Sequence, residues 1–292
     1  MPAYLLDARN PFLVLLWSFG LFMLMHGHQY IGGLIAAHAG RVSMDSVMSG
    51  KHETPRSVLL RGVAAVVVGL PLVWLSVTLL WGRPLVWMGL SFQWGWLVLG
   101  LGMGLLATFL IVFALAKMRL ARVAMGHDGV RGAEMMSAIV GLTLMAVFAG
   151  ISEEIVFRGM MGLELSLAWG WLASVLVTGV SFGFVHLLGQ LKTLTVRKVL
   201  TLLVSSIAVS FLFISLYRFS GSLWLPIGFH IAWNYAHSVL LGLEMNGKPP
   251  VASCLQTRLD SRSWLVGGEA GMESSVPAIA GYCLLGLLFT VL

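Results

Sequence analysis

Two adjacent glutamates, Glu153 and Glu154, stand in a stretch of sequence that is otherwise apolar. Residues 135–157 contain no other charged side chain, Arg158 follows directly, and the whole chain of 292 residues holds only 12 acidic ones. An ionisable side chain at bilayer depth costs about 2.5–3.5 kcal/mol on insertion scales, so it marks a candidate functional site. The alternative, that the pair ends a helix, is disfavoured because apolar residues resume after Arg158.

Two further apolar stretches carry polar side chains at helical spacing. Phe182 and His186 are four residues apart, and His230, Asn234 and His237 follow the i, i+4, i+7 pattern. Residues with this spacing share one face of a helix. Inside a membrane such a face is expected to point to the bundle interior or to a water-filled cavity.

The spacing also predicts different roles for the two glutamates. Glu154 and Arg158 are at i and i+4, so they are expected to form an ion pair on one helix face. Glu153 then remains as the carboxylate available for chemistry. Glu164, farther along, is expected to lie at the membrane interface.

A carboxylate and an imidazole around one water form a general-base pair. A second imidazole and an amide can donate hydrogen bonds to a developing oxyanion, at about 3–4 kcal/mol per donor. Such a set could hydrolyse a peptide bond without a serine or cysteine nucleophile. Ser181 is more than a turn from His186 and on another face.

The same residue types admit a metal site. Glu153, His186 and His230 would supply the two histidines and one glutamate of some catalytic zinc centres. The chain has no His-Glu-x-x-His helix, and Asn234 has no place as a zinc ligand. A metal-free site is therefore favoured, with zinc as the alternative.

Composition places these residues in a membrane protein. The chain is 58% hydrophobic and 10% charged, whereas soluble domains carry about 25% charged residues. The apolar runs are long and continuous, which predicts an all-α bundle of membrane helices rather than a barrel. About eight spans are predicted, at residues 11–36, 58–81, 94–116, 135–166, 171–189, 199–217, 221–243 and 275–292.

The basic residues predict the topology. All but four of the 18 lie in or beside the loops at 37–61, 117–134, 190–198 and 245–274, and the four are Arg9, Arg83, Arg158 and Arg218. The positive-inside rule makes these loops cytoplasmic, so both termini are predicted to be non-cytoplasmic. The loops account for the net charge of +6, and no nucleic-acid partner is expected. No disulfide is expected between Cys254 and Cys283 in a reducing compartment.

Counting residues tests whether the polar side chains share a depth. If the chain turns at Trp169-Gly170, Glu153 precedes the turn by 16 residues and His186 follows it by 16, so the two lie level. His230, nine residues past Gly221, lies roughly 14 Å into the bilayer from the same side.

Together these motifs resemble the CPBP family, the CAAX protease and bacteriocin-processing enzymes, also called Abi proteins. The family pattern corresponds to Glu153-Glu154-x-x-x-Arg158, Phe182-x-x-x-His186 and His230-x-x-x-Asn234, in this order on three spans. The resemblance covers roughly residues 150–240. It implies an integral membrane protein, expected in a bacterial plasma (inner) membrane. It divides the single membrane domain into N-terminal helices, 1–134, and a protease-like core, 135–292.

The resemblance implies glutamate-dependent intramembrane endoproteolysis of a peptide or membrane-protein substrate. Glu153 and His186 would activate water, and His230 and Asn234 would form the oxyanion hole. Glu154, Arg158, Phe182 and His237 would be supporting residues. Family members have also been regarded as metalloproteases with the same residues, so the zinc alternative carries over to a CAAX-type metalloendopeptidase.

Two other classes of function use a similar polar site. A non-catalytic bacteriocin-immunity or scaffold protein could bind a peptide in the same cavity. A proton-coupled transporter could use the glutamates and histidines as a relay, although the two halves show no internal repeat of the kind common in transporters.

Overall fold

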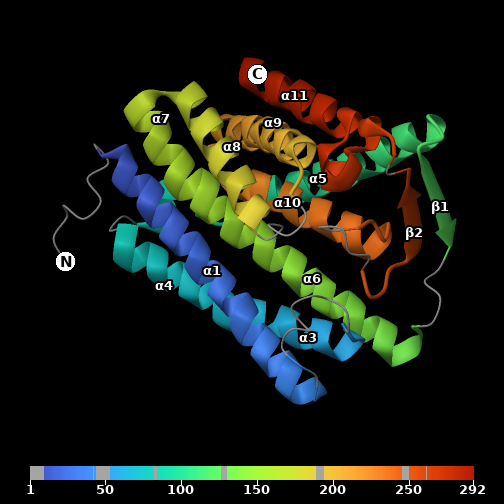
Figure 1. Cartoon of the computed structure of the whole chain (residues 1–292). Coiled ribbons are helices and arrows are strands. Elements are labelled where there is room, and N and C mark those ends of the chain that lie inside the picture. The colour runs from blue at the N-terminus through green and yellow to red at the C-terminus, as the bar shows by residue number, and fades with distance from the viewer. Residues whose placement is uncertain are drawn as a thin grey trace.

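The computed structural model describes residues 10–41, 43, 53–81, 84–125, 130–188, 194–244, 250–260 and 262–292. Parts of all four predicted basic loops lie outside the described residues. The described part of the chain is predominantly helical (Figure 1), which confirms the predicted all-α class. The helical elements are α1 (Pro11–Gly40), α3 (Pro55–Ala64), η1 (Ala65–Gly69), α4 (Leu70–Trp81), η2 (Leu85–Met88), α5 (Trp94–Lys117), α6 (Gly132–Glu154), η3 (Ile155–Gly162), α7 (Leu163–Trp169), α8 (Trp171–Leu188), α9 (Val196–Ser220), α10 (Trp224–Tyr235), η5 (Ala236–Leu240), η6 (Trp264–Val266), η7 (Gly268–Ala270), η8 (Met272–Ser274) and α11 (Val276–Val291).

Within the described residues, five helices are long and apolar enough to cross a membrane. They are Pro55–Leu79, Trp94–Lys117, Gly132–Trp169, Trp171–Leu188 and Val196–Ser220. A shorter apolar helix covers Val276–Val291. Every predicted span coincides with helical residues, while the count of eight crossings remains a prediction. The start of α1 and the C-terminus lie towards one end of the bundle, away from the β-strands (Figure 1).

The longest helical rod runs through α6, η3 and α7 for 38 residues. At 1.5 Å per residue it is about 57 Å long, well beyond the ~30 Å hydrocarbon core of a bilayer. It ends at Gly170, whose φ of +85° turns the chain into α8. The hairpin predicted at Trp169-Gly170 is therefore confirmed.

Glycines allow α10 to pack closely against its neighbours. A Cβ atom on Gly228 of α10 would lie 3.2 Å from the Cα of Gly100 on α5, and one on Gly104 would lie 3.0 Å from the Cβ of Ala232. Small residues four apart are typical of close helix contacts in membranes, where packing replaces the hydrophobic effect as the driving force. In the fold α10 contacts both α5 and α6, and these contacts fix the position of His230.

The sequence analysis did not predict the two-stranded antiparallel sheet. Strand β1 (Ala121–Met125) pairs with β2 (Leu255–Leu259), with Ala121 opposite Leu259 and Met125 opposite Leu255. Both strands lie in predicted cytoplasmic loops, where extended backbone can find a partner outside the hydrocarbon core. The sheet joins a loop of the N-terminal part, 1–134, to one of the core, 135–292.

The buried apolar side chains form two clusters. One contains Val73, Phe157, Met160 and Phe182, and the other contains Leu115, Phe213, Phe229 and Tyr282 among others. Phe182 and Phe213, one from each cluster, both contact Arg158. Arg158 therefore lies where the two clusters meet.

Candidate active site

The glutamate pair lies within the long rod rather than at its end. Glu153 and Glu154 are the last residues of α6, and the helix continues directly as the π-helical segment η3. All eight residues of η3 are buried. Short π-helical segments are frequently found at functional sites. The alternative that the pair ends a helix is therefore wrong.

A buried hydrogen-bond network joins α6, η3, α9 and α10. Arg158 Nη1 donates to Glu154 Oε1 at 3.0 Å, as the i, i+4 spacing predicted. The same Oε1 atom lies 2.8 Å from His230 Nδ1. The other end of the guanidinium, Nη2, donates to Ser210 Oγ at 3.4 Å. The side chains of Glu154 and Arg158 are fully buried, so Glu154 connects the cation on η3 to the imidazole on α10.

The bond from Arg158 fixes the proton on His230. The Oε1 atom that accepts from the guanidinium acts as an acceptor towards His230 as well, so Nδ1 of His230 carries a hydrogen. His230 Nε2 then points to the other glutamate, with Glu153 Oε2 at 3.8 Å. This distance exceeds a direct hydrogen bond and suits one shared water molecule. Glu153 is 17% exposed at its side chain and Glu154 is 0% exposed, so only Glu153 has room for a reactant.

Two phenylalanine rings enclose the guanidinium. The Arg158 carbon Cζ lies 5.0 Å from the ring centre of Phe182 and 4.7 Å from that of Phe213. Cation–π contacts of this kind are worth about 2 kcal/mol when they are desolvated. The ring of Phe213 also lies 5.5 Å from the ring of His230. One aromatic side chain of α9 therefore positions both the cation and the imidazole.

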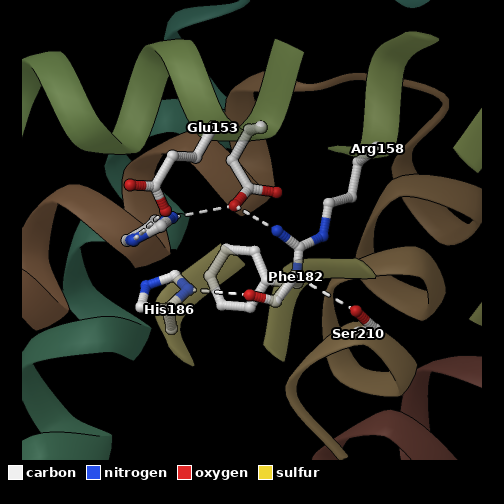
Figure 2. A network of polar contacts seen from close by, with 7 residues as sticks. Glu153, Arg158, Phe182, His186 and Ser210 are labelled. Atoms are coloured by element: carbon white, nitrogen blue, oxygen red, sulfur yellow. Dashed lines mark hydrogen bonds and ion pairs between the residues drawn. The ribbon is translucent and has the colours of Figure 1, made fainter. Parts of the chain in front are cut away.

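His186 lies beside the same aromatic ring. Its imidazole is 4.3 Å from the ring of Phe182, and its Nδ1 lies 2.8 Å from the backbone carbonyl oxygen of Phe182. A carbonyl oxygen only accepts, so Nδ1 carries a hydrogen and neutral His186 has its lone pair on Nε2. Figure 2 shows Arg158 and His186 flanking Phe182, with Glu153 nearby in this view.

The remaining predicted residues extend along α10. Asn234 lies one helical turn after His230 and is partly exposed, and its backbone carbonyl accepts a hydrogen bond from Ser238 Oγ. His237 is buried in η5, and its Nε2 lies 3.3 Å from the carbonyl oxygen of Glu244. The three residues of the predicted polar stripe therefore have different surroundings. His230 joins the network, Asn234 lies next to it on α10, and His237 holds the chain that follows η5.

Several buried polar atoms of the site have no protein partner within the described residues. They include Glu154 Oε2, Arg158 Nε and Ser152 Oγ. An unsatisfied buried polar atom costs about 1–3 kcal/mol. Such atoms are rare and call for an explanation, such as a catalytic role or bound water. Their concentration around Glu154 makes this part of the fold the candidate functional site.

Sequence reasoning missed two residues and misjudged one. Ser210 and Phe213 lie on α9, which has no charged side chain between Lys198 and Arg218 to attract attention. Their only signal is the i, i+3 spacing that places them on one face. Glu164, expected at the interface, is 2% exposed. It belongs to α7, which the long rod carries into contact with α1 and α8.

The three residues predicted as zinc ligands are not grouped closely enough to bind one metal ion. Across the part of the chain that the structure describes, no three His, Cys, Asp or Glu side chains are grouped so that they could hold a metal. Glu153, His186 and His230 are the residues that a metal would require. His230 Nδ1 is already bonded to Glu154, and its Nε2 is the only nitrogen directed at Glu153.

Gly150 allows α6 and α10 to touch where the network crosses between them. A Cβ atom at Gly150 would lie 2.9 Å from the backbone nitrogen of Ile231, the neighbour of His230. Gly150→Val is expected to push α10 away from the glutamates and to lower the rate of the peptide cleavage that the resemblance implies by about 100-fold, because a 1 Å misplacement can cost that much. The matched control is Gly102→Val, since Gly102 has nothing within 4 Å of its Cβ position. Equal cleavage rates for the two variants would contradict this role of Gly150.

The fold and the site together define a class: a polytopic helical membrane protein with a buried cluster of carboxylate, guanidinium and imidazole groups. A family model described as type II CAAX prenyl endopeptidase Rce1-like matches residues 135–236. Over this segment, about a third of the chain, the sequence is similar to the CAAX prenyl endopeptidases, which are proteases. The matched residues include Glu153, Arg158, His186, His230 and Asn234. Searches of curated proteins and of solved structures found no match.

Proposed function

We propose that the chain is an intramembrane endopeptidase of the glutamic type, in which Glu153 and His186 activate a water molecule for attack on a peptide bond. The observation that carries this proposal is the 2.8 Å contact between Glu154 and His230. It brings α10 against the glutamate pair and places Glu153 Oε2 3.8 Å from His230 Nε2, close enough for both groups to contact the same water molecule. The family assignment favours a protease over a transporter or an immunity protein.

Water activation requires a proton acceptor within hydrogen-bond reach of the water. Glu153 is the more exposed of the two glutamates and has a carboxylate oxygen directed at the gap. His186 has its Nδ1 hydrogen engaged by the Phe182 carbonyl, so Nε2 is the atom that would take a proton. As water attacks the carbonyl carbon, its proton passes to Glu153 or His186, and it later reaches the leaving amine.

The tetrahedral intermediate carries a negative charge on the former carbonyl oxygen. His230 and Asn234 are proposed to donate hydrogen bonds to this oxygen. For His230 the donor is Nε2–H of the protonated ring, and that cation is stabilised by the carboxylate of Glu154 at its Nδ1. Arg158, held by Ser210 and two phenylalanine rings, orients the carboxylate of Glu154. Glu154 and Arg158 are therefore positioning residues.

A reconstitution experiment tests the proposal. The purified chain is placed in lipid vesicles with a pool of peptides anchored by a C-terminal apolar segment, and cleaved bonds are identified by mass spectrometry. We expect cleavage by the wild-type chain and a loss of about 10²–10⁴-fold in His186→Ala, the usual contribution of a general base. His38→Ala is the control, because His38 is an exposed residue at the end of α1.

The same experiment distinguishes the zinc alternative. After dialysis against a chelator, the proposed mechanism retains its activity, whereas a metalloendopeptidase loses activity and regains it when zinc is added. Peptides that bind with equal affinity to wild type and His186→Ala but are never cut would instead indicate a scaffold or immunity protein.

A further inference from the structure

A hollow lies beside the hairpin of α7 and α8, on the side where α9 ends. It has a volume of about 290 Å³, and its lining is mostly apolar, including Leu163 and Leu167 of α7 and Trp171 of α8. Leu167 is 61% exposed, so the hollow opens on the lateral surface of the bundle. At ~30 Å³ per water-sized group it accommodates about ten such groups. That is the volume of a segment of an acyl chain.

A single cation stands at the edge of this hollow. Arg218, in the last turn of α9, lines the hollow and lies over the ring of Trp171 at 5.2 Å. Among the residues that the structure describes, no carboxylate lies within ion-pair distance of Arg218. Arg218 is also one of only four basic residues outside the predicted cytoplasmic loops and their edges.

Two hydroxyl-bearing side chains also line the hollow. They belong to Ser166 of α7 and Tyr217 of α9. Guanidinium and hydroxyl groups donate hydrogen bonds to phosphate oxygens. The planar guanidinium of arginine can donate two parallel hydrogen bonds to one phosphate. The hollow therefore combines an apolar wall with a cationic, hydrogen-bonding edge.

We propose that this hollow binds one phospholipid, with its phosphate at Arg218, Ser166 and Tyr217 and part of one acyl chain along α7 and α8. The occupant is a phospholipid because the hollow faces sideways from a membrane-embedded bundle, where lipid is the surrounding solvent. The unpaired positive charge complements the phosphate. A neutral amphiphile would leave the guanidinium without an anionic partner.

The bound lipid would lie close to the elements that hold Arg158. Gly162, the last residue of η3, and Ile214 of α9 line the hollow. Gly162 is four residues after Arg158, and Ile214 is four residues after Ser210. Each is one helical turn from a member of the buried network. Lipid in the hollow would thus stabilise the packing of η3 against α9.

The proposal is tested by lipid binding, independently of any protease activity. The purified chain in neutral detergent is titrated with phosphatidylglycerol, and one-to-one complexes are counted by native mass spectrometry. Arg218→Ala removes the cation, and Ser166→Phe fills the hollow. Each is expected to raise the Kd of the first lipid by at least about tenfold, which corresponds to the loss of one charge-assisted hydrogen bond. Arg218→Lys keeps the charge but loses the two-pronged guanidinium, so it is expected to give a Kd between those of wild type and Arg218→Ala.

Arg197→Ala is the matched control, because it removes the same charge from the exposed opposite end of α9. It is expected to leave the Kd of the first lipid unchanged. Equal affinity of wild type and Arg218→Ala would overturn the proposal, as would equal weakening by Arg218→Ala and Arg197→Ala. If diacylglycerol bound as tightly as phosphatidylglycerol, the hollow would bind only the apolar part of a lipid, and the phosphate site would be wrong. Inorganic phosphate that displaces the lipid at micromolar concentration would show a phosphate site without a lipid chain.

Discussion

Replacement of Glu153 by glutamine is expected to abolish peptide cleavage while the protein still inserts and folds. The side chain is partly exposed, and its Oε2 atom lies 3.8 Å from Nε2 of His230. Glutamine preserves the volume and the polar contacts but cannot accept a proton. The expected loss is about 10²–10⁴-fold in rate, the usual contribution of a general base. The measurement is the rate of product formation in vesicles, with the unfolding temperature recorded for each variant.

The control for this variant lies on the same helix. Glu134→Gln removes an exposed carboxylate from the first turn of α6. It is expected to change the rate by no more than about twofold, as for surface substitutions in general. If Glu153→Gln cut an identified peptide as fast as Glu134→Gln, the assignment of Glu153 as the base would be wrong.

Replacement of Glu154 by glutamine is expected to destabilise the fold strongly. Glu154 and Arg158 are both fully buried, and the carboxylate also accepts from His230. Removing one partner of a buried ion pair leaves an uncompensated charge and costs about 3–5 kcal/mol. The decrease in unfolding free energy can be measured by chemical denaturation in detergent. This effect distinguishes the two neighbouring glutamates, since the more exposed Glu153 makes no comparable pair.

A second ion pair in the chain serves as a control for this prediction, and a double variant serves as a compensating change. Glu53 and Arg61 also form an ion pair, but their side chains are 22% and 19% exposed. Glu53→Gln is therefore expected to cost only about 0–1 kcal/mol. The double variant Glu154→Leu with Arg158→Met removes both buried charges and is expected to recover most of the lost stability. A Glu154→Gln variant as stable as Glu53→Gln would contradict the structural role of the pair.

The sequence predicted those features of the site that depend on one helix or one turn. The Glu154–Arg158 ion pair follows from i, i+4 spacing, and the hairpin follows from a glycine after a long apolar run. It also predicted that the polar stripe of α10 would face the bundle interior or a water-filled cavity, because a polar stripe on an apolar membrane helix is expected to avoid lipid. These inferences need no knowledge of how the helices are packed.

Other features depend on packing that spacing does not encode. Counting residues from the turns predicted that His230 and Glu153 differ in depth by about 10 Å. In the structure their side chains lie 3.8 Å apart. The difference arises because the α7–α8 hairpin extends farther than the turn between α9 and α10. The roles of Ser210 and Phe213 depend on the rotation of α9. The bond from Glu154 to His230 was not foreseen, because His230 had been interpreted as an oxyanion donor or, in the alternative, as a zinc ligand.

The central claim is that Glu153 acts on water in a site that needs no metal. Its most direct test measures the release of an anchored reporter peptide by the chelator-treated, reconstituted chain and by its Glu153→Gln variant, at equal amounts of folded protein. The account predicts release by the wild-type chain and none above background by the variant. Equal release by both, or release by the wild-type chain only after zinc is restored, would contradict it.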